Sequence, residues 1–539
     1  MTAVDEYVIG DAPLGIAELV AVAREGRRVA LGAAARERLA AARIVVDQVV
    51  AEERVAYGVT TGFGQLATTH IPAAKVRELQ QNLVRSHAVG VGAPLPREVV
   101  RAAMLVRAST LSKGYSGVRS EVVELLVGML DADVVPYVPS RGSLGASGDL
   151  APSAHVVLAM MGEGEVMVEE GCDGDGTGGQ DACIGREPSG PALRAAGLAP
   201  VTLEAKEGLA LLNGTQFMAA IGALAVADGE ALLDSADLIG AMSIEGLRAS
   251  VGPFQERIQL LRPIPGQLAT AANVRRATAG SAIMLSHLNC DKVQDAYSIR
   301  CIPQVHGACR DAFRWLREVV EVEIESVTDN PIIFPETAEI ISAGNFHGEP
   351  LALALDLAAM SFAEIGNMSE RRIFRMLSPF LSELPPYLTT DSGLNNGYMI
   401  AQYTAAALVA ENKVLCHPAS VDSIPSSGDQ EDHVSMGMTA ALKLVDVARN
   451  TQTILGIEAL CAAQAIDLLA PLTPGVGTAR GHAIVREFAP MLGRDRYLAP
   501  EIEAAAAAVR EGAFARVAHD LKDAADDAAS ERSGVRGEE

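Results

Sequence analysis

Residues 145–152 read Gly-Ala-Ser-Gly-Asp-Leu-Ala-Pro, and this stretch decides how the rest of the chain is interpreted. Its small residues permit a tight, strained turn. In such a turn, no side chain blocks the amide nitrogen of Gly148 from approaching the carbonyl carbon of Ala146. The alternative is an ordinary small-residue turn, because short glycine motifs also recur by chance.

Ring closure between these two atoms has a specific chemical outcome. Loss of one water from the ring, and of a second from the Ser147 side chain, leaves an exocyclic methylidene. The product, 4-methylidene-imidazol-5-one, is an electrophile that no standard side chain supplies. Asp149 is placed to assist the proton transfers. The sequence thus predicts a prosthetic group made from Ala146, Ser147 and Gly148, and we expect no nucleotide. The histidines lack metal-ligand spacing such as HExxH, so we also expect no metal.

Around this turn, the pattern of the chain favours helices. The first 200 residues alternate short helical patterns with glycine-punctuated loops, and residues 169–192 predict a flexible surface insertion. Long apolar-periodic segments follow at 205–250, 305–326, 350–377, 399–416 and 436–470. We expect a mainly α fold with a loop-rich N-terminal region (1–200), a central bundle of long helices (201–480) and a C-terminal helical region with a frayed acidic tail (481–539).

The bulk composition favours a soluble protein of the cytoplasm. The chain carries 44 basic and 68 acidic residues, a formal charge of −24, which argues against nucleic acid and membrane surfaces as partners. Seven scattered cysteines without a CxxC pair indicate reduced thiols. No signal-peptide pattern is visible. The longest uncharged run, Leu209 to Ala227, is broken by polar residues and predicts a buried core segment.

Further motifs accompany the Ala-Ser-Gly turn. They are Tyr57-Gly58-Val59-Thr60-Thr61-Gly62-Phe63-Gly64, Leu83-Val84-Arg85-Ser86-His87-Ala88, Leu212-Asn213-Gly214-Thr215, Val293-Gln294-Asp295-Ala296-Tyr297-Ser298-Ile299-Arg300, Gly344-Asn345-Phe346-His347-Gly348 and Gln430-Glu431-Asp432-His433-Val434-Ser435-Met436. In this order they resemble the aromatic amino acid ammonia-lyase and aminomutase family, from about residue 50 to 470. The resemblance implies the ammonia-lyase fold, the prosthetic group described above, and a homotetramer with active sites shared between subunits.

The resemblance also implies a catalytic set. It comprises Tyr57, Ala146, Ser147, Gly148, Asn213 and Tyr297. Tyr57 lies in a segment that looks like the family's mobile tyrosine loop, where the tyrosine is the base; the alternative is a core aromatic. A phenol normally titrates at about 10, so this role needs a cationic or strongly hydrogen-bonding environment.

Six residues are expected to bind the substrate: His87, Gln294, Arg300, Phe346, Met399 and Glu431. Arg300 can bind a carboxylate through two parallel N–H bonds, and it shares a face with Tyr297 if that segment is helical. A buried Glu431 needs a partner, and an imidazole is apt for it. His87 could add a second hydrogen bond to the same group. A structural ion pair is the alternative for Glu431.

Ser86-His87 and Glu431 resemble the histidine ammonia-lyases of the family. They predict a carbon–nitrogen lyase that eliminates ammonia from L-histidine to give urocanate. Two alternatives stay open. Ile302 resembles the aromatic aminomutases, which would return ammonia to the β-carbon of a tyrosine-like or heteroaromatic substrate. The second alternative is a non-catalytic helical assembly protein on the same scaffold. The intact Ala-Ser-Gly turn, Tyr57, Tyr297 and Arg300 argue against it.

Overall fold

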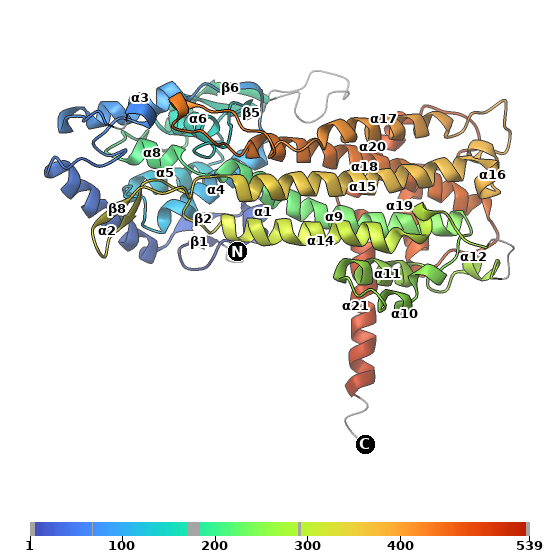
Figure 1. Ribbon diagram of the computed structural model, residues 1–539. Coiled ribbons are helices and arrows are strands. Elements are labelled where there is room, and N and C mark those ends of the chain that lie inside the picture. Colours follow the sequence, from blue (N-terminus) through green and yellow to red (C-terminus); the bar gives the residue numbers. More distant parts are fainter. Residues whose placement is uncertain (1–5, 67, 170–183, 289–292, 535–539) are drawn as a thin grey trace. The chain divides into compact units, whose positions relative to one another are not determined.

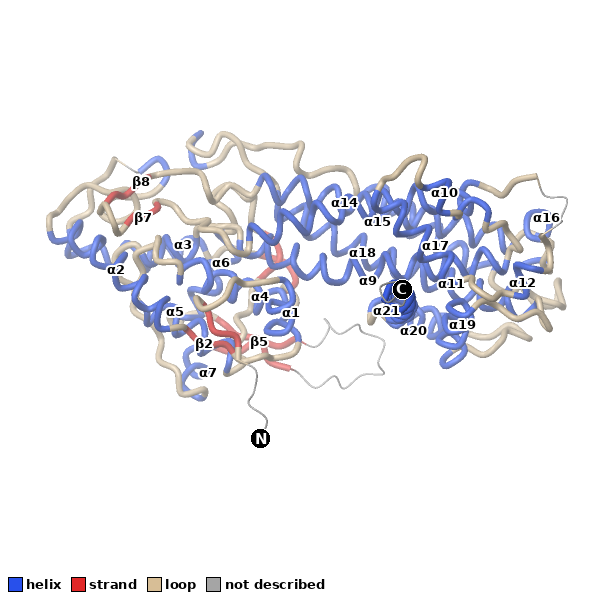
Figure 2. Tube along the Cα trace, turned by 90° about the horizontal axis from the view of Figure 1, so that it is seen from below, coloured by secondary structure: helices blue, strands red, loops and turns tan. Residues whose placement is uncertain are grey.

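The computed structural model describes residues 6–66, 68–169, 184–288 and 293–534. Within these ranges the chain forms twenty-one α-helices and four two-stranded sheets (Figure 1). The strands are short pieces among the helices (Figure 2). The mainly α fold predicted from the sequence is confirmed.

The chain divides into two compact units. Unit 1 comprises Met1–Ala227, Leu316–Asp356 and Pro418–Leu442, and unit 2 comprises Asp228–Trp315, Leu357–His417 and Lys443–Glu539. This division follows contacts in space, whereas the three regions expected above follow the order of the sequence, and those three regions stay a prediction.

Unit 1 contains all the strands and most of the shorter helices of the N-terminal half. Its elements are β1 (Tyr7–Ile9), α1 (Ile16–Arg24), β2 (Val29–Leu31), α2 (Ala33–Ala51), α3 (Val76–His87), β3 (Val91–Pro94), α4 (Arg97–Ser112), α5 (Ser120–Asp131), β4 (Pro139–Arg141), α6 (Leu150–Met160), β5 (Glu165–Glu169), β6 (Ile184–Pro188), α7 (Ser189–Ala195), α8 (Glu207–Leu212), β7 (Ile332–Phe334) and β8 (Glu339–Ile341). The β1–β2 pair is parallel, and the pairs β3–β4, β5–β6 and β7–β8 are antiparallel.

Unit 2 is helical in its described residues. Its own helices are α10 (Glu256–Gln259), α11 (Pro265–Ala277), α12 (Ala282–Leu285), α13 (Tyr297–Arg300), α16 (Pro379–Ser382), α17 (Met399–Leu415), α19 (Val476–Phe488), α20 (Ala499–Arg510) and α21 (Ala513–Gly534). Four long helices contribute residues to both units: α9 (Gln216–Gly246), α14 (Ile302–Glu323), α15 (Glu349–Leu377) and α18 (Gly437–Leu468). The helices predicted from apolar periodicity at these positions are therefore confirmed.

Helix α4 forms the centre of unit 1. Every residue from Val99 to Ser112 is buried, and α1 and α5 pack against this helix. Its Ala, Leu, Met and Val residues favour that burial, and its buried Ser and Thr hydroxyls are hydrogen-bonded. Two arginines, Arg101 and Arg107, are buried with it.

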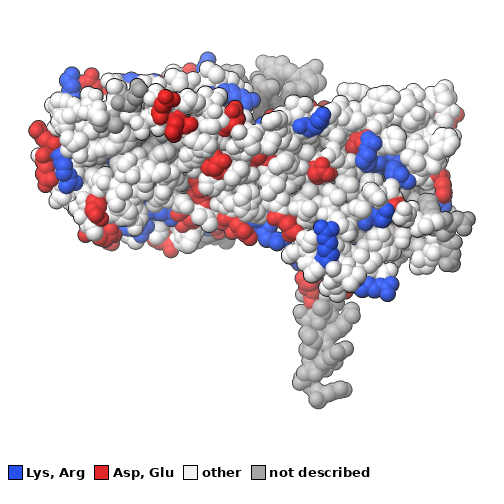
Figure 3. All heavy atoms as spheres, viewed as in Figure 1, with Lys and Arg blue, Asp and Glu red and all other residues white. Residues whose placement is uncertain are grey.

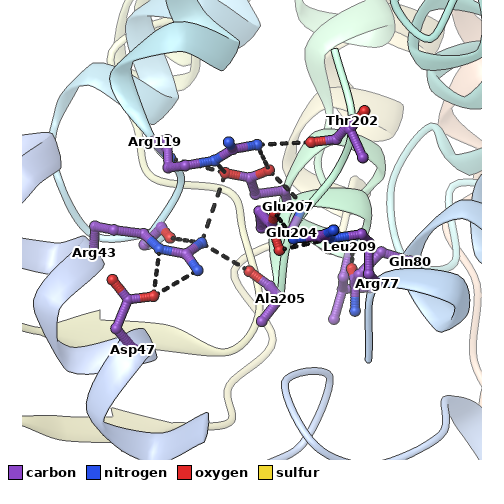
Figure 4. Close-up of polar contacts among 11 residues, drawn as sticks. Arg43, Asp47, Arg77, Gln80, Arg119, Thr202, Glu204, Ala205, Glu207 and Leu209 are labelled. Carbon is purple, nitrogen blue, oxygen red and sulfur yellow. Dashed lines mark hydrogen bonds and ion pairs between the residues drawn. The ribbon is translucent and has the colours of Figure 1, made fainter. Parts of the chain in front are cut away.

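A polar network fixes α8, the short helix that leads into Asn213-Gly214 (Figure 4). Glu207, at the start of α8, is fully buried and accepts two parallel hydrogen bonds from Arg119, at 2.7 and 2.8 Å. Arg43 lies 3.6 Å from the same carboxylate. On the other side, Gln80 of α3 accepts a hydrogen bond from the Leu209 amide at 3.1 Å. These contacts orient α8 and hence the residues that follow it.

The long helices of unit 2 pack closely because small residues line their contacts. A Cβ on Gly229 of α9 would lie 2.2 Å from the Phe313 ring of α14. The Phe313 ring lies 4.4 Å from that of Phe362 in α15. Between α15 and α18 a fully buried ion pair joins Arg372 to Glu458, with Nη2 and Oε2 2.8 Å apart, and Ser243 of α9 donates to the same carboxylate at 2.6 Å.

Among the described residues, two helices, α9 and α15, are long and apolar enough to cross a membrane by length and composition alone. The most apolar windows of these helices are 78% and 67% buried inside the structure, which is the pattern of core helices. The prediction that residues 209–227 form a buried core segment is confirmed. On the face that Figure 3 shows, acidic and basic side chains are interspersed.

The predicted flexible insertion at 169–192 needs a correction at its C-terminal end. Residues 170–183 lie outside the described residues. Residues 184–188 form β6, which pairs with β5 from Glu165 to Glu169, and α7 begins at Ser189. The composition misled the prediction here because the strand is stabilised by backbone pairing, which needs few apolar side chains.

We expect Glu458→Ala to lower the free energy of unfolding by about 3–5 kcal/mol, because it leaves the Arg372 charge buried without a partner. The matched control is Asp520→Ala, which breaks the exposed pair with Arg480 in the same unit and should cost less than about 1 kcal/mol. Urea unfolding at equal protein concentration measures both. Equal stability of the two variants would contradict the central role of the buried pair.

Candidate active site

Ala146-Ser147-Gly148 forms a turn that lies directly against Gly214. Gly148 has a φ of +80°, in the left-handed region, and a Cβ there would lie 2.1 Å from the Gly214 carbonyl oxygen. The Gly214 amide donates to the Ser147 carbonyl at 3.2 Å, and its carbonyl accepts from the Asp149 amide at 2.7 Å. Only glycine can therefore occupy position 148 in this backbone arrangement.

The other flank of the turn is held by the segment before α18. The Met436 amide donates to the Leu144 carbonyl at 2.9 Å, and the Ser435 hydroxyl donates to the Gly145 carbonyl at 3.3 Å. Ala146 packs in a small apolar cluster with Val434 and Met436. The turn is thus fixed at both ends by segments far away in the sequence.

Asp149 is fully buried at the start of α6. Its Oδ2 accepts hydrogen bonds from the Phe217 and Met218 amides, each at 2.9 Å, and its Oδ1 accepts one from Ser143 at 3.1 Å. Burial raises the pKa of the carboxyl to about 6, although these hydrogen bonds and the Arg107 charge act in the opposite direction. A carboxyl that titrates close to neutral pH is suited to proton transfer beside Gly148.

Glu431 contacts the turn directly. Its Oε1 accepts a hydrogen bond from the Ser147 hydroxyl at 2.8 Å, and its Oε2 accepts one from Ser426 at 2.7 Å. Backbone hydrogen bonds between Ser426 and Glu431 close the loop that carries the carboxylate. No salt bridge of Glu431 is found among the described residues, so its partners are hydroxyls rather than the structural ion pair considered above.

His87 ends α3, and its ring is half-buried. Its Nδ1 lies 2.8 Å from the Leu83 carbonyl, which can only accept, so Nδ1 carries the proton and Nε2 is the acceptor. Burial lowers the pKa of the imidazole, while the nearby charge of Glu431 acts to raise it. His87 therefore presents a neutral ring in the surroundings of Glu431 at neutral pH.

Tyr57 and Asn213 are tied to the same framework. Gln80 connects them, because its side chain donates to the Gly58 carbonyl at 3.3 Å and accepts from Leu209, one helix turn before Asn213. The Tyr57 hydroxyl accepts a hydrogen bond from the Gly64 amide at 3.4 Å. The side-chain amide of the buried Asn213 donates to the Asn330 backbone carbonyl at 3.0 Å.

Phe346 lies in the turn that precedes α15 and is half-buried. The next residue, His347, stacks on His433 with the ring centroids 5.7 Å apart and bonds to its carbonyl at 3.2 Å. This contact ties the Phe346 turn to the segment that carries Glu431. The role of Phe346 in substrate binding stays a prediction.

The remaining predicted residues lie in unit 2. Tyr297 and Arg300 are the first and last residues of α13, and the guanidinium carbon of Arg300 lies 4.6 Å from the centre of the Tyr297 ring. The prediction that they share a helical face is confirmed. Gln294 lies exposed before α13, and Met399 begins α17. The roles expected for all these residues stay predictions.

Sequence reasoning missed several residues that hold the turn. They are Gln80, Arg107, Ser143, Gly214 and Ser426. Only Arg107 could have been recognised from the sequence, because a charged residue among the apolar residues of α4 indicates a buried polar contact. Ser143 and Ser426 bond to residues only five or six positions away, but a serine in a loop carries no specific signal of such a contact. The partners of Gln80 and Gly214 lie in distant segments.

A comparison with protein families matches residues 14–487 to the aromatic amino acid lyases. The chain belongs to the aromatic amino acid lyase family. A histidine ammonia-lyase from Anaeromyxobacter sp. (strain K) is 53% identical over 93% of this chain and 97% of its own length. Membership of an enzyme family disfavours the non-catalytic alternative.

Solved structures of the lyase family have the same fold. The histidine ammonia-lyase from Trypanosoma cruzi superposes with a TM-score of 0.87 at 40% identity and covers 96% of both chains. A tyrosine aminomutase from Streptomyces globisporus superposes with a TM-score of 0.88 at 36% identity, covering 96% of this chain and 99% of its own. The fold is thus common to lyases and aminomutases, while the higher sequence identity is to histidine ammonia-lyases.

The raised pKa of Asp149 predicts a specific dependence of stability on pH. Because the folded carboxyl titrates at about 6, its protonated form stabilises the protein at low pH, and this contribution is lost as the pH rises through 6. Relative to Asp149→Asn, the free energy of unfolding should fall by about 1 kcal/mol between about pH 5 and pH 7.5. Urea unfolding of both proteins measures this, and a difference independent of pH would contradict a buried, titrating Asp149.

Proposed function

We propose that this protein eliminates ammonia from L-histidine to give urocanate. The observation that carries the proposal is the hydrogen bond between Glu431 and the Ser147 hydroxyl at 2.8 Å. It brings a carboxylate, apt for an imidazole N–H, next to the residue from which the electrophile would form. The identity of 53% to a histidine ammonia-lyase over almost the whole chain supports the same substrate.

The turn fits the formation of 4-methylidene-imidazol-5-one from Ala146-Ser147-Gly148. The space beside Gly148 admits no Cβ, and glycine adopts the positive φ of this position without steric cost, so the turn can reach the required tight conformation. When present, the group supplies an electrophilic carbon to which a substrate amine adds, so that ammonia becomes a good leaving group. This chemistry requires no metal or nucleotide.

Recognition of the imidazole would fall to Glu431 and His87. Glu431 accepts hydrogen bonds, and His87 offers Nε2 as a second acceptor because Nδ1 is engaged with Leu83. Two acceptors match the two N–H donors of a protonated imidazole ring. The ring of phenylalanine carries no polar hydrogen, so a carboxylate facing it would lose hydration without a replacement.

The remaining residues would orient the substrate and move protons. Tyr57 would remove the β-proton, and its place in a glycine-containing loop allows it to cover a bound substrate. Arg300 would bind the substrate carboxylate, with its orientation supported by the Tyr297 ring at 4.6 Å. Asn213, Gln294, Phe346 and Met399 would line the site.

We also propose a cytoplasmic homotetramer in which each active site takes residues from more than one subunit. The predicted residues fall into two sets, with Tyr57, His87, Asn213 and Glu431 in unit 1 and Gln294, Tyr297, Arg300 and Met399 in unit 2. Assembly of the two sets from different copies of the chain would complete the site.

The function is tested by incubating the purified protein with L-histidine, L-tyrosine and L-phenylalanine in parallel. We expect equal amounts of ammonia and urocanate from histidine, and no β-histidine, because the proposed reaction releases both products. Liquid chromatography with mass detection measures the acrylates and the β-amino acids together. Turnover of another amino acid without urocanate formation would contradict the substrate assignment, and accumulation of β-histidine would support the aminomutase.

Glu431→Gln should lower kcat/KM for histidine by about 10- to 100-fold, which corresponds to the loss of a hydrogen bond to a charged group. Asp432→Asn is the matched control, because it removes the same charge from the next residue, which is exposed. Steady-state kinetics measures turnover, and the melting temperature checks folding. Equal turnover by the two variants would rule out a role for Glu431 in recognition.

A further inference from the structure

Gly214 fixes both peptide units at Gly148. Its N–H donates to the Ser147 carbonyl at 3.2 Å, and that carbonyl belongs to the planar peptide unit that contains the Gly148 nitrogen. Its carbonyl accepts from the Asp149 N–H at 2.7 Å, which belongs to the following peptide unit. One residue therefore sets the orientation of the nitrogen that has to attack Ala146.

The two reacting groups themselves are left free. Among the described residues, neither the Gly148 N–H nor the Ala146 carbonyl has a hydrogen-bond partner, whereas the carbonyls of Leu144, Gly145 and Ser147 are all bonded. A backbone N–H that donates no hydrogen bond can approach a carbonyl carbon without first breaking a bond. The turn is thus held at its flanks and open at its reacting atoms.

Arg107 of α4 lies directly behind Gly214. Its Nη2 donates to the Asn213 carbonyl and, at 2.7 Å, to the Gln216 side chain. A Cβ on Gly214 would lie 2.5 Å from this nitrogen and 2.6 Å from the Thr328 hydroxyl. The guanidinium therefore contacts the residue that contacts Gly148.

Burying Arg107 lowers the stability of the fold, so stability alone does not explain why an arginine lies here. The side chain is fully buried, and its Nε and Nη1 have no hydrogen-bond partner in the described part of the chain. An apolar residue would fill the same space without unsatisfied donors. The charge acts on two buried carboxylates, Asp329 and Asp149; Asp329 already pairs with Lys206 at 2.6 Å, while Asp149 adjoins the reacting nitrogen.

We propose that Gly214, held by Arg107, is the template on which the Ala146-Ser147-Gly148 ring closes, with Arg107 as a positioning residue for ring formation. The inference rests on the prosthetic group of the proposed function and assigns it a maturation apparatus outside the substrate site. The ring C–N bond forms between Gly148 N and Ala146 C. The Ala146 oxygen leaves as water with the protons of the Gly148 and Ser147 amides, and the Ser147 hydroxyl leaves as water with the Ser147 α-proton.

To test this, the mass of the full-length protein is measured at intervals after translation is stopped in the cells that express it. Ring formation removes two water molecules, which intact-mass measurement detects without any substrate. Arg107→Lys keeps the charge, but its side chain is shorter, so the single nitrogen that bonds to both the Asn213 carbonyl and Gln216 is withdrawn from Gly214. We expect it to lose the two waters about tenfold more slowly than the parent, a loss of about 1.4 kcal/mol in positioning. Gly214→Ala should slow the loss further.

Arg101→Lys is the matched control for Arg107→Lys. Arg101 is a buried arginine of the same helix, but it bonds to the Val22 and Leu130 carbonyls and to Asp133, away from the turn. We expect it to lose the waters at the parental rate. Parental rates in folded Arg107→Lys and Gly214→Ala would overturn the proposal.

If Arg107→Lys folds poorly, a separate measurement distinguishes a role in positioning from a role in folding. Ser147→Ala cannot form the methylidene, and intact mass shows whether it also keeps the water of ring closure; where it keeps that water, the stability of Ser147→Ala with and without Arg107→Lys reports folding alone. Similar stability of these two proteins supports the positioning role; strong destabilisation by Arg107→Lys in this background makes Arg107 a folding residue and overturns the proposal. A parent chain that loses two waters but leaves histidine unchanged would refute only the substrate assignment, whereas a parent that retains both waters refutes the prosthetic group itself.

Discussion

Two glycine backbones, Gly148 and Gly214, meet with no side chain between them, and a Cβ on Gly148 would lie 2.1 Å from the Gly214 carbonyl oxygen. The rest of the site depends on this contact. Helix α8 brings Gly214 to the turn, and the Glu207 network and Gln80 hold α8 in place. The Asp149 carboxylate caps the amides at the start of α9, which continues from Gly214. Helices α8 and α9 are therefore both anchored at this one backbone contact.

The cost of this arrangement is buried charge. Asp149, Arg107, Lys206 and Asp329 are all buried in unit 1, and burial lowers the pKa values of Arg107 and Lys206 while it raises that of Asp149. An apolar core would be simpler to stabilise. Groups with perturbed pKa values that gather beside a glycine with no room for a side chain are typical of a functional site rather than of a structural core.

In the proposed function, Glu431 has one hydrogen-bond partner before the prosthetic group forms and another when the substrate binds. In the uncyclised chain its Oε1 bonds to the Ser147 hydroxyl. Ring formation would remove that hydroxyl, so the carboxylate would lose this donor at the moment when the electrophile appears. A substrate N–H would then replace it. The same carboxylate that is satisfied by the precursor thus becomes available for recognition, while Ser426 continues to hold its other oxygen.

The sequence predicted the features that depend on local chemistry. The Ala-Ser-Gly composition indicates a ring-forming turn, the apolar periodicity predicts the long helices, and the spacing of Tyr297 and Arg300 predicts their contact on one helical turn. Each of these depends on residues only a few positions apart. Periodicity and composition report such neighbours directly.

Tertiary structure decided which distant residues hold that turn. Ser147 and Glu431 are 284 positions apart, and Arg107 and Gln216 are 109 apart. No local pattern could have paired Gln80 with Leu209, or shown that Gly214 rather than another glycine meets Gly148. The backbone pairing of β6 was also hidden from composition. The physical reason is that hydrogen bonds and close packing between distant segments depend on where the chain folds back, and the neighbouring residues in the sequence carry no record of that position.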